Sequence, residues 1–105
     1  MADKAWKAFE RRSAKRWGTV RIGPTGDDGA DFVSEFLYVQ CKLRKSIPLW
    51  LLEAIDNAVN AAKGTERKGV ALVKKLNMRD DDAIVLMRLK DFEEFYELRK
   101  GDRDE

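Results

Sequence analysis

The chain of 105 residues contains no histidine, one cysteine (Cys41) and two prolines. The absence of histidine excludes a Ser-His-Asp triad, a Cys-His pair, His-ligated zinc and every histidine general base. A single cysteine excludes an internal disulfide and a cysteine-rich zinc site, and it predicts a reducing, cytoplasmic environment. Any catalysis must therefore depend on carboxylates, lysines and a hard metal ion.

Long apolar runs are also missing. No segment approaches the roughly 18–20 apolar residues that a membrane-spanning helix needs. The stretch from Trp6 to Trp17 is rich in charge where a secretory signal would be apolar. We expect no membrane association and a single domain over residues 1–105. Its core would cover about residues 4–89, followed by an acidic C-terminal helix and tail over about 90–105.

The net charge of +2 conceals an asymmetry along the chain. Residues 1–76 carry 15 Lys and Arg against 9 Asp and Glu, whereas residues 77–105 carry 6 against 10. A basic body with an acidic tail suits a partner rich in phosphate. An ordinary solvated surface explains the same charges equally well.

The pattern of apolar residues and helix-breaking residues predicts an α/β protein. The expected helices cover residues 2–17, 47–63 and a short stretch from about 91. The expected strands cover residues 19–22, 31–34, 36–45, 70–76 and 83–89. Gly18 and Gly64 would end the first two helices, and Ser46 would cap the second. This order predicts a mixed central sheet flanked by helices, with the second helix as a right-handed crossover if the strands beside it are parallel.

Residues 36–45 show the clearest strand pattern, because apolar odd positions alternate with polar even positions. The even positions are Tyr38, Gln40, Lys42 and Arg44. One face of this strand should pack against the protein core, and the other should be exposed to solvent. Gln40 and Lys42 then point the same way, about 6–7 Å apart. A plain solvated face is the alternative.

Two carboxylates add to this pattern. Glu10 lies within the apolar stripe of the first helix, where burial is costly without a partner; a glutamate at the stripe edge that reaches solvent is the alternative. Asp31 follows the glycine-rich loop at 23–29, where a turn aspartate is also common. Oxygen donors beside a lysine suit a hard divalent cation and the hydrolysis of phosphodiesters.

These residues resemble the PD-(D/E)XK nuclease superfamily. Glu10, Asp31 and Gln40-Cys41-Lys42, together with the order of elements, carry the resemblance over about residues 4–89. The short length and the Lys-Ala-Phe-Glu-Arg-Arg opening are most like small archaeal and phage Holliday-junction resolvases. The resemblance implies a restriction-endonuclease-like αβββαβ core and a Mg²⁺-dependent, structure-specific endodeoxyribonuclease.

The resemblance also implies roles for individual residues. Glu10, Asp31, Gln40 and Lys42 would be catalytic, and Mg²⁺ (or Mn²⁺) would be held by Glu10, Asp31, Gln40 and the backbone carbonyl of Cys41. The family has an acidic residue where this chain has Gln40. Metal affinity should therefore fall, and we expect activity to depend on Mn²⁺ or on a DNA phosphate as a further ligand. Ala30 also stands where a proline is common.

The partner implied is DNA with a branched four-way junction, cut by a homodimer because such a junction needs two symmetric incisions. Basic residues that would contact phosphates without reading sequence are Arg11, Arg12, Lys15, Arg21, Arg44, Lys45, Arg67 and Lys68. The expected location is the cytoplasm of a bacterial, archaeal or phage-infected host cell.

Other functions remain open on the sequence. The chain could be another nuclease of the same superfamily with a nicking, restriction or repair role. It could be a DNA-binding module with weakened or lost catalysis, which Gln40 favours. A structural interaction protein is the third choice, and it would show no salt-dependent DNA binding.

Overall fold

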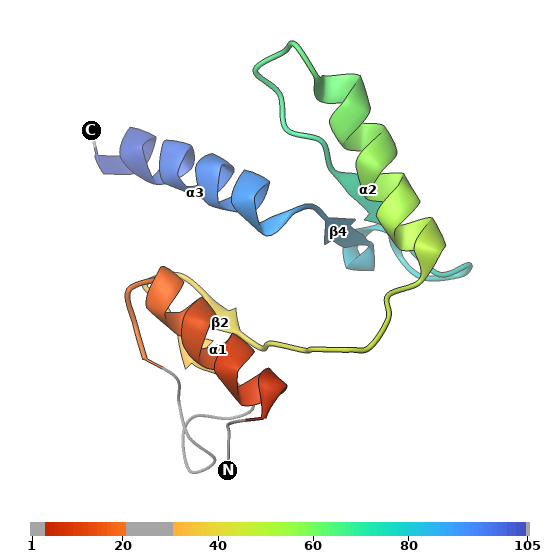
Figure 1. Ribbon diagram of the computed structural model, residues 1–105. Coiled ribbons are helices and arrows are strands. Elements are labelled where there is room, and N and C mark those ends of the chain that lie inside the picture. The colour runs from red at the N-terminus through yellow and green to blue at the C-terminus, as the bar shows by residue number, and fades with distance from the viewer. Residues whose placement is uncertain (1–3, 21–30, 105) are drawn as a thin grey trace. The chain divides into compact units, whose positions relative to one another are not determined.

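The computed structural model describes residues 4–20 and 31–104 of the chain. The protein is mixed α/β, and its described residues form three α-helices and two small antiparallel sheets (Figure 1). It divides into two compact units, Met1–Ser46 and Ile47–Glu105. Each unit contains one of the two sheets.

The first unit begins with helix α1 (Ala5–Arg16). Its Ala, Lys and Arg residues favour helix, and Lys15 and Arg16 in the last turn complement the negative end of the helix dipole. As predicted, Gly18 follows the end of the helix: it has a φ of 74° and donates its N–H to the Lys15 carbonyl at 3.0 Å. Glycine adopts this left-handed conformation without the strain that a Cβ would add.

Strands β1 (Phe32–Val33) and β2 (Tyr38–Val39) form a short antiparallel hairpin in the first unit. Phe32 pairs with Val39, and the Ser34 N–H closes the turn on the Leu37 carbonyl at 2.9 Å. Phe32 is 1% exposed and Ala14 of α1 is fully buried. The apolar side of α1 therefore packs on β1 and forms the small core of this unit.

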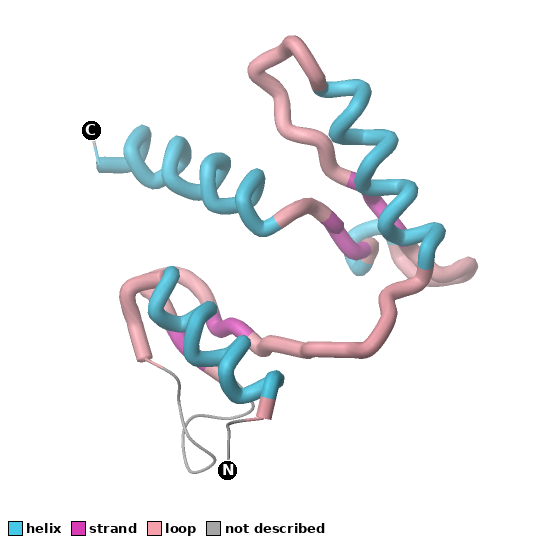
Figure 2. Tube along the Cα trace, viewed as in Figure 1, coloured by secondary structure: helices cyan, strands magenta, loops and turns pink. Residues whose placement is uncertain are grey.

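The second unit contains two longer helices and the second hairpin (Figure 2). Its elements are α2 (Leu49–Ala62), β3 (Ala71–Val73), the 3-10 turn η1 (Asp80–Asp82), β4 (Ile84–Leu86) and α3 (Leu89–Asp104). Leu72 pairs with Val85 at the centre of the β3–β4 hairpin. Helix α2 packs on β3 and buries Ile55. No helix in the described ranges combines the length and apolarity required to cross a bilayer.

The structure corrects the predicted strands. The strand expected over 36–45 is confirmed only at Tyr38–Val39, because its partner β1 is itself two residues long and offers no further ladder. The described strands form two antiparallel pairs instead of one mixed sheet, since β3 pairs with β4 across a short connection. The second helix is therefore not a crossover between two parallel strands. Residues 19–20 are not in a strand, and residues 21–30 lie outside the described ranges.

Two helix boundaries also differ from the prediction. Ser46 is not the N-cap of α2: Pro48 precedes the helix in extended conformation, with no side-chain cap. The fixed φ of proline suits it to a helix start without a capping side chain. Helix α3 is longer than the short helix expected, because it continues through the charged tail to Asp104.

Gly69 is required by a close approach between the chain and α2. A Cβ at Gly69 would lie 2.5 Å from the carbonyl carbon of Ala58 and the nitrogen of Val59, both backbone atoms that cannot move aside easily. We expect Gly69→Ala to lower the free energy of unfolding by about 1–3 kcal/mol, as overpacking does. Urea denaturation followed by circular dichroism measures this loss. Gly64→Asn is the control, because nothing lies within 4 Å of a Cβ added at Gly64 and Asn tolerates its positive φ. Equal stability of Gly69→Ala and the wild type would contradict the prediction.

Candidate functional site

Glu10 lies in the middle of α1 and is 6% exposed, and it is the only buried charged side chain within residues 4–20 and 31–97. The alternative of a helix-edge glutamate that reaches solvent is therefore wrong. Removing a carboxylate from water is costly unless hydrogen bonds or positive charge compensate it. The sequence position within the apolar stripe does indicate this burial, because the same stripe carries the buried Ala14.

Asp31 lies immediately before β1 and is half-buried. Its N–H donates to the Val39 carbonyl at 2.7 Å, so it continues the hairpin by one step. Its side-chain Oδ2 accepts the backbone N–H of Cys41 at 2.5 Å. This bond joins residues ten apart in the chain, so Asp31 does not act as a local turn aspartate. The carboxylate is fixed against the segment that follows β2.

The causes of the pKa shift of the Cys41 thiol indicate which groups lie near it. Its pKa is raised, mainly because burial removes the sulfur from water. A hydrogen bond with Ser13 opposes the shift, whereas the negative charges of Asp31 and Glu10 add to it. Glu10 and Ser13 of α1 thus lie near Asp31 and Cys41 of the hairpin. Ser13 lies three residues from Glu10 on the same face of α1.

Gln40 and Lys42 flank Cys41 in the chain, and both side chains are exposed. The predicted display of even positions is confirmed, since Tyr38 is 74% exposed and Cys41 between Gln40 and Lys42 is half-buried. The β1–β2 register ends at Phe32 and Val39, so Gln40 follows directly after the paired residues. The structure therefore brings Glu10, Asp31 and Cys41 together and leaves the other two side chains directed to solvent beside them.

The oxygen atoms of these residues are of the types that hard cations bind. Glu10 and Asp31 offer carboxylate oxygens, Gln40 an amide oxygen and Cys41 a backbone carbonyl, and Mg²⁺ prefers oxygen ligands while keeping several waters. Within residues 4–20 and 31–104 no group of three or more His, Cys, Asp or Glu side chains is arranged to hold a metal ion. Position 40 carries a neutral glutamine, so it adds no carboxylate to Glu10 and Asp31.

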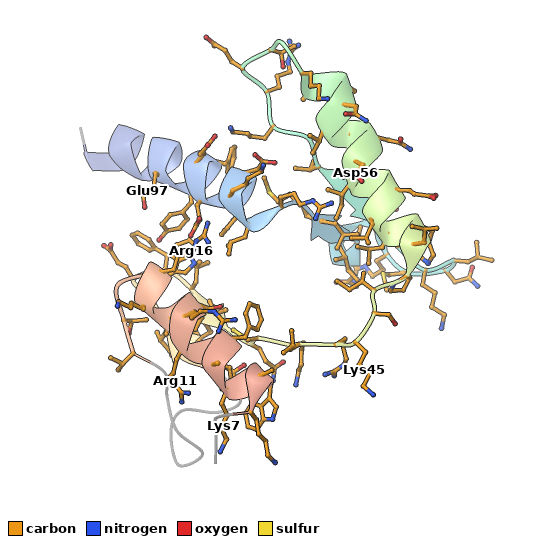
Figure 3. The ribbon with its side chains drawn as sticks, in the orientation of Figure 1. Lys7, Arg11, Arg16, Lys45, Asp56 and Glu97 are labelled. Atoms are coloured by element: carbon orange, nitrogen blue, oxygen red, sulfur yellow. The ribbon has the colours of Figure 1, made fainter. Side chains whose placement is uncertain are left out.

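The first unit also carries several exposed basic side chains. Arg11, Arg12 and Lys15 are exposed on α1, and Figure 3 shows the side chains of Lys7 and Arg11 extending away from the helix. Arg44 and Lys45 are also exposed, and the Arg44 guanidinium donates to the Leu43 carbonyl. Arg21 lies outside the described residues.

Arg67 and Lys68 belong to the second unit, in the loop after α2. The Lys68 ammonium forms an ion pair with the Glu94 carboxylate of α3. The hydrogen bond between them raises the pKa of Lys68 and lowers that of Glu94. This pairing partly neutralises the charge of Lys68, so Arg67 is the stronger candidate for a phosphate contact in this loop.

No family model matches the chain, and comparisons with curated proteins and with solved structures find no match either. The functional argument therefore rests on the residues and their geometry. The first unit contributes all of Glu10, Asp31, Gln40, Cys41 and Lys42.

Proposed function

We propose that the protein is a metal-dependent endodeoxyribonuclease that hydrolyses DNA phosphodiesters, with a four-way junction as its preferred substrate. The observation that carries the proposal is the convergence of the buried Glu10 carboxylate, the Asp31 carboxylate and the main chain of Cys41. Two carboxylates near the same thiol, on a unit with an exposed basic helix surface, would attract both a divalent cation and a phosphate backbone. The nuclease resemblance uses the same residues.

Each residue has a role in this proposal. Glu10 and Asp31, with the Gln40 amide and the Cys41 carbonyl, would hold Mg²⁺ or Mn²⁺. The ion supplies charge neutralisation at the phosphoryl oxygens and an activated water when it is bound. The Cys41 N–H fixes the orientation of the Asp31 carboxylate. The exposed Lys42 ammonium stabilises the negative charge that develops on the phosphoryl group.

The basic surface of α1 would bind the DNA backbone. Arg11 and Lys15 lie one helical turn apart and are exposed, so they form one face that contacts phosphates without reading bases. Recognition of a junction then depends on its shape. Two symmetric cuts require a homodimer. The proposal includes a restriction-endonuclease-like core and a cytoplasmic location in a bacterial, archaeal or phage-infected cell.

The test is a cleavage assay with the purified protein, Mg²⁺ or Mn²⁺, a four-way junction and a linear duplex of the same sequence. We expect paired incisions in the junction and slower cleavage of the duplex. Equal or faster cleavage of the duplex would favour a nuclease with a nicking, restriction or repair role. No cleavage of any DNA with either metal would reject the nuclease function.

A DNA-binding module with lost catalysis is the second candidate, because Gln40 removes one negative charge from the metal site. We expect wild-type protein to bind Mn²⁺ weakly and Gln40→Glu to bind it about tenfold more tightly or better, since ligand charge governs affinity for hard cations. Isothermal titration calorimetry measures both constants. Asn60→Asp, on the exposed side of α2, adds the same charge elsewhere and is the control. Mn²⁺ binding by Gln40→Glu and none by the wild type would favour the non-catalytic module.

A further inference from the structure

A row of exposed side chains follows the hairpin of the first unit and the segment after it. Even positions from 36 to 42 are exposed, whereas positions 37, 39 and 41 are half-buried. The exposed row consists of Phe36, Tyr38, Gln40 and Lys42. It begins with two aromatic rings and ends at a lysine. Its last two members belong to the candidate site.

Tyr38 has the most exposed aromatic side chain in the described part of the chain, with 74% of its surface accessible. Within residues 4–20 and 31–97 its ring contacts no other ring or cation, and its hydroxyl makes no hydrogen bond. Its backbone is nevertheless fixed, because Tyr38 pairs with Val33 across the hairpin. The ring is therefore held at the surface of β2 and is open to a ligand.

We propose that Tyr38 is a stacking platform for an unpaired DNA base, while Lys42 contacts the phosphates of the same strand. This inference rests on the proposed function and deepens it, because it adds unpaired bases to the substrate. A chain extends by at most about 3.6 Å per residue, so the backbones of Tyr38 and Lys42 lie within about 14 Å of each other. About four stacked nucleotides span that distance.

The composition of this surface suits a single strand better than a duplex. Proteins that bind single strands combine aromatic side chains, on which bases stack, with cations that follow the backbone. Tyr38 and Lys42, followed by the exposed Arg44, supply both. A base inside a duplex is covered by its neighbours, and leaving the stack costs least for a mismatched or single-stranded base. Tyr38 should therefore favour DNA with unpaired bases at a branch point over a continuous duplex.

The first readout is DNA binding without metal. Fluorescence anisotropy in EDTA measures the affinity for a labelled oligothymidylate of about 12 nucleotides and for a duplex of the same length. We expect Tyr38→Val to weaken oligothymidylate binding about tenfold and duplex binding less than about twofold, since valine suits the strand but has no ring. Tyr38→Phe keeps the ring and should bind both as the wild type does.

Trp50→Ala is the control, because it removes an exposed aromatic ring from α2 in the second unit. It should bind oligothymidylate with wild-type affinity. An equal loss in Trp50→Ala and Tyr38→Val would overturn the proposal. So would wild-type affinity of Tyr38→Val for oligothymidylate, an equal loss for both DNA probes, or a wild type that binds no oligothymidylate.

The second readout reports stacking directly. The fluorescence of 2-aminopurine falls when this base stacks on an aromatic ring, so 2-aminopurine is substituted into the oligothymidylate. We expect its fluorescence to fall on binding to the wild type and to change little on saturation with Tyr38→Val. Unchanged fluorescence on binding to the wild type would overturn the stacking role.

These outcomes separate the platform from the nuclease function. A wild type that cuts no DNA but shows ring-dependent binding and quenching would reject the nuclease function and retain the Tyr38 platform. Junction cleavage by the wild type, with oligothymidylate binding unaffected in Tyr38→Val, would reject the platform and retain the nuclease function.

Discussion

Asp31→Asn should reduce the rate of DNA cleavage about 100-fold or more without unfolding the protein. The change removes one of the two carboxylate charges that would hold the cation, and such ligands contribute several kcal/mol to catalysis by charge stabilisation. The asparagine oxygen can still accept the Cys41 N–H, so the hairpin contact is retained. Single-turnover cleavage of a four-way junction in Mg²⁺ and in Mn²⁺ measures the loss.

The matched control is Asp81→Asn, because Asp81 is an exposed carboxylate in η1 of the second unit. It makes the same change in charge and should cut at the wild-type rate. Circular dichroism should show the same helix content for all three proteins. If Asp31→Asn cleaves the junction as fast as Asp81→Asn does, Asp31 does not belong to a metal site and the proposed chemistry is wrong.

Lys42→Ala should lower kcat about 100-fold and leave KM nearly unchanged. The ammonium would act on charge that develops only in the transition state, and the loss of one such donor has an effect of this size. Lys42 is exposed, so its removal should leave the stability of the fold unaffected. Steady-state kinetics on the junction separate the two constants.

Lys45→Ala is the control for Lys42, since Lys45 is an exposed lysine three residues further along the same segment. It should weaken DNA binding, reduce the slope of affinity against salt concentration by about one, and leave kcat unaltered. A similar loss of kcat in both variants would mean that Lys42 acts as an ordinary phosphate contact. That outcome removes it from the catalytic set.

The helices were predictable because the signals that define them are local. Apolar spacing and the glycine at position 18 place the first helix, and Gly64, with a φ of 77°, follows the end of α2 as expected. The strands were less predictable because pairing joins residues that are distant in sequence. The alternation over 36–45 correctly gives the displayed side chains at Gln40 and Lys42. It gives no information on the length of the partner strand, which limits β2 to two residues.

The candidate site likewise has features that the sequence predicted and features that only the tertiary structure shows. Sequence alone selected Glu10, Asp31 and the Gln40–Lys42 segment by residue type and spacing, and it fixed the absence of histidine chemistry. Only the tertiary structure decided that Glu10 is buried, that Asp31 bonds to Cys41 and that Lys68 pairs with Glu94. The last of these pairs is 26 residues apart. Local patterns determine which side chains a segment presents, whereas contacts across the chain depend on how helix and hairpin pack, and that packing is not encoded in any one segment.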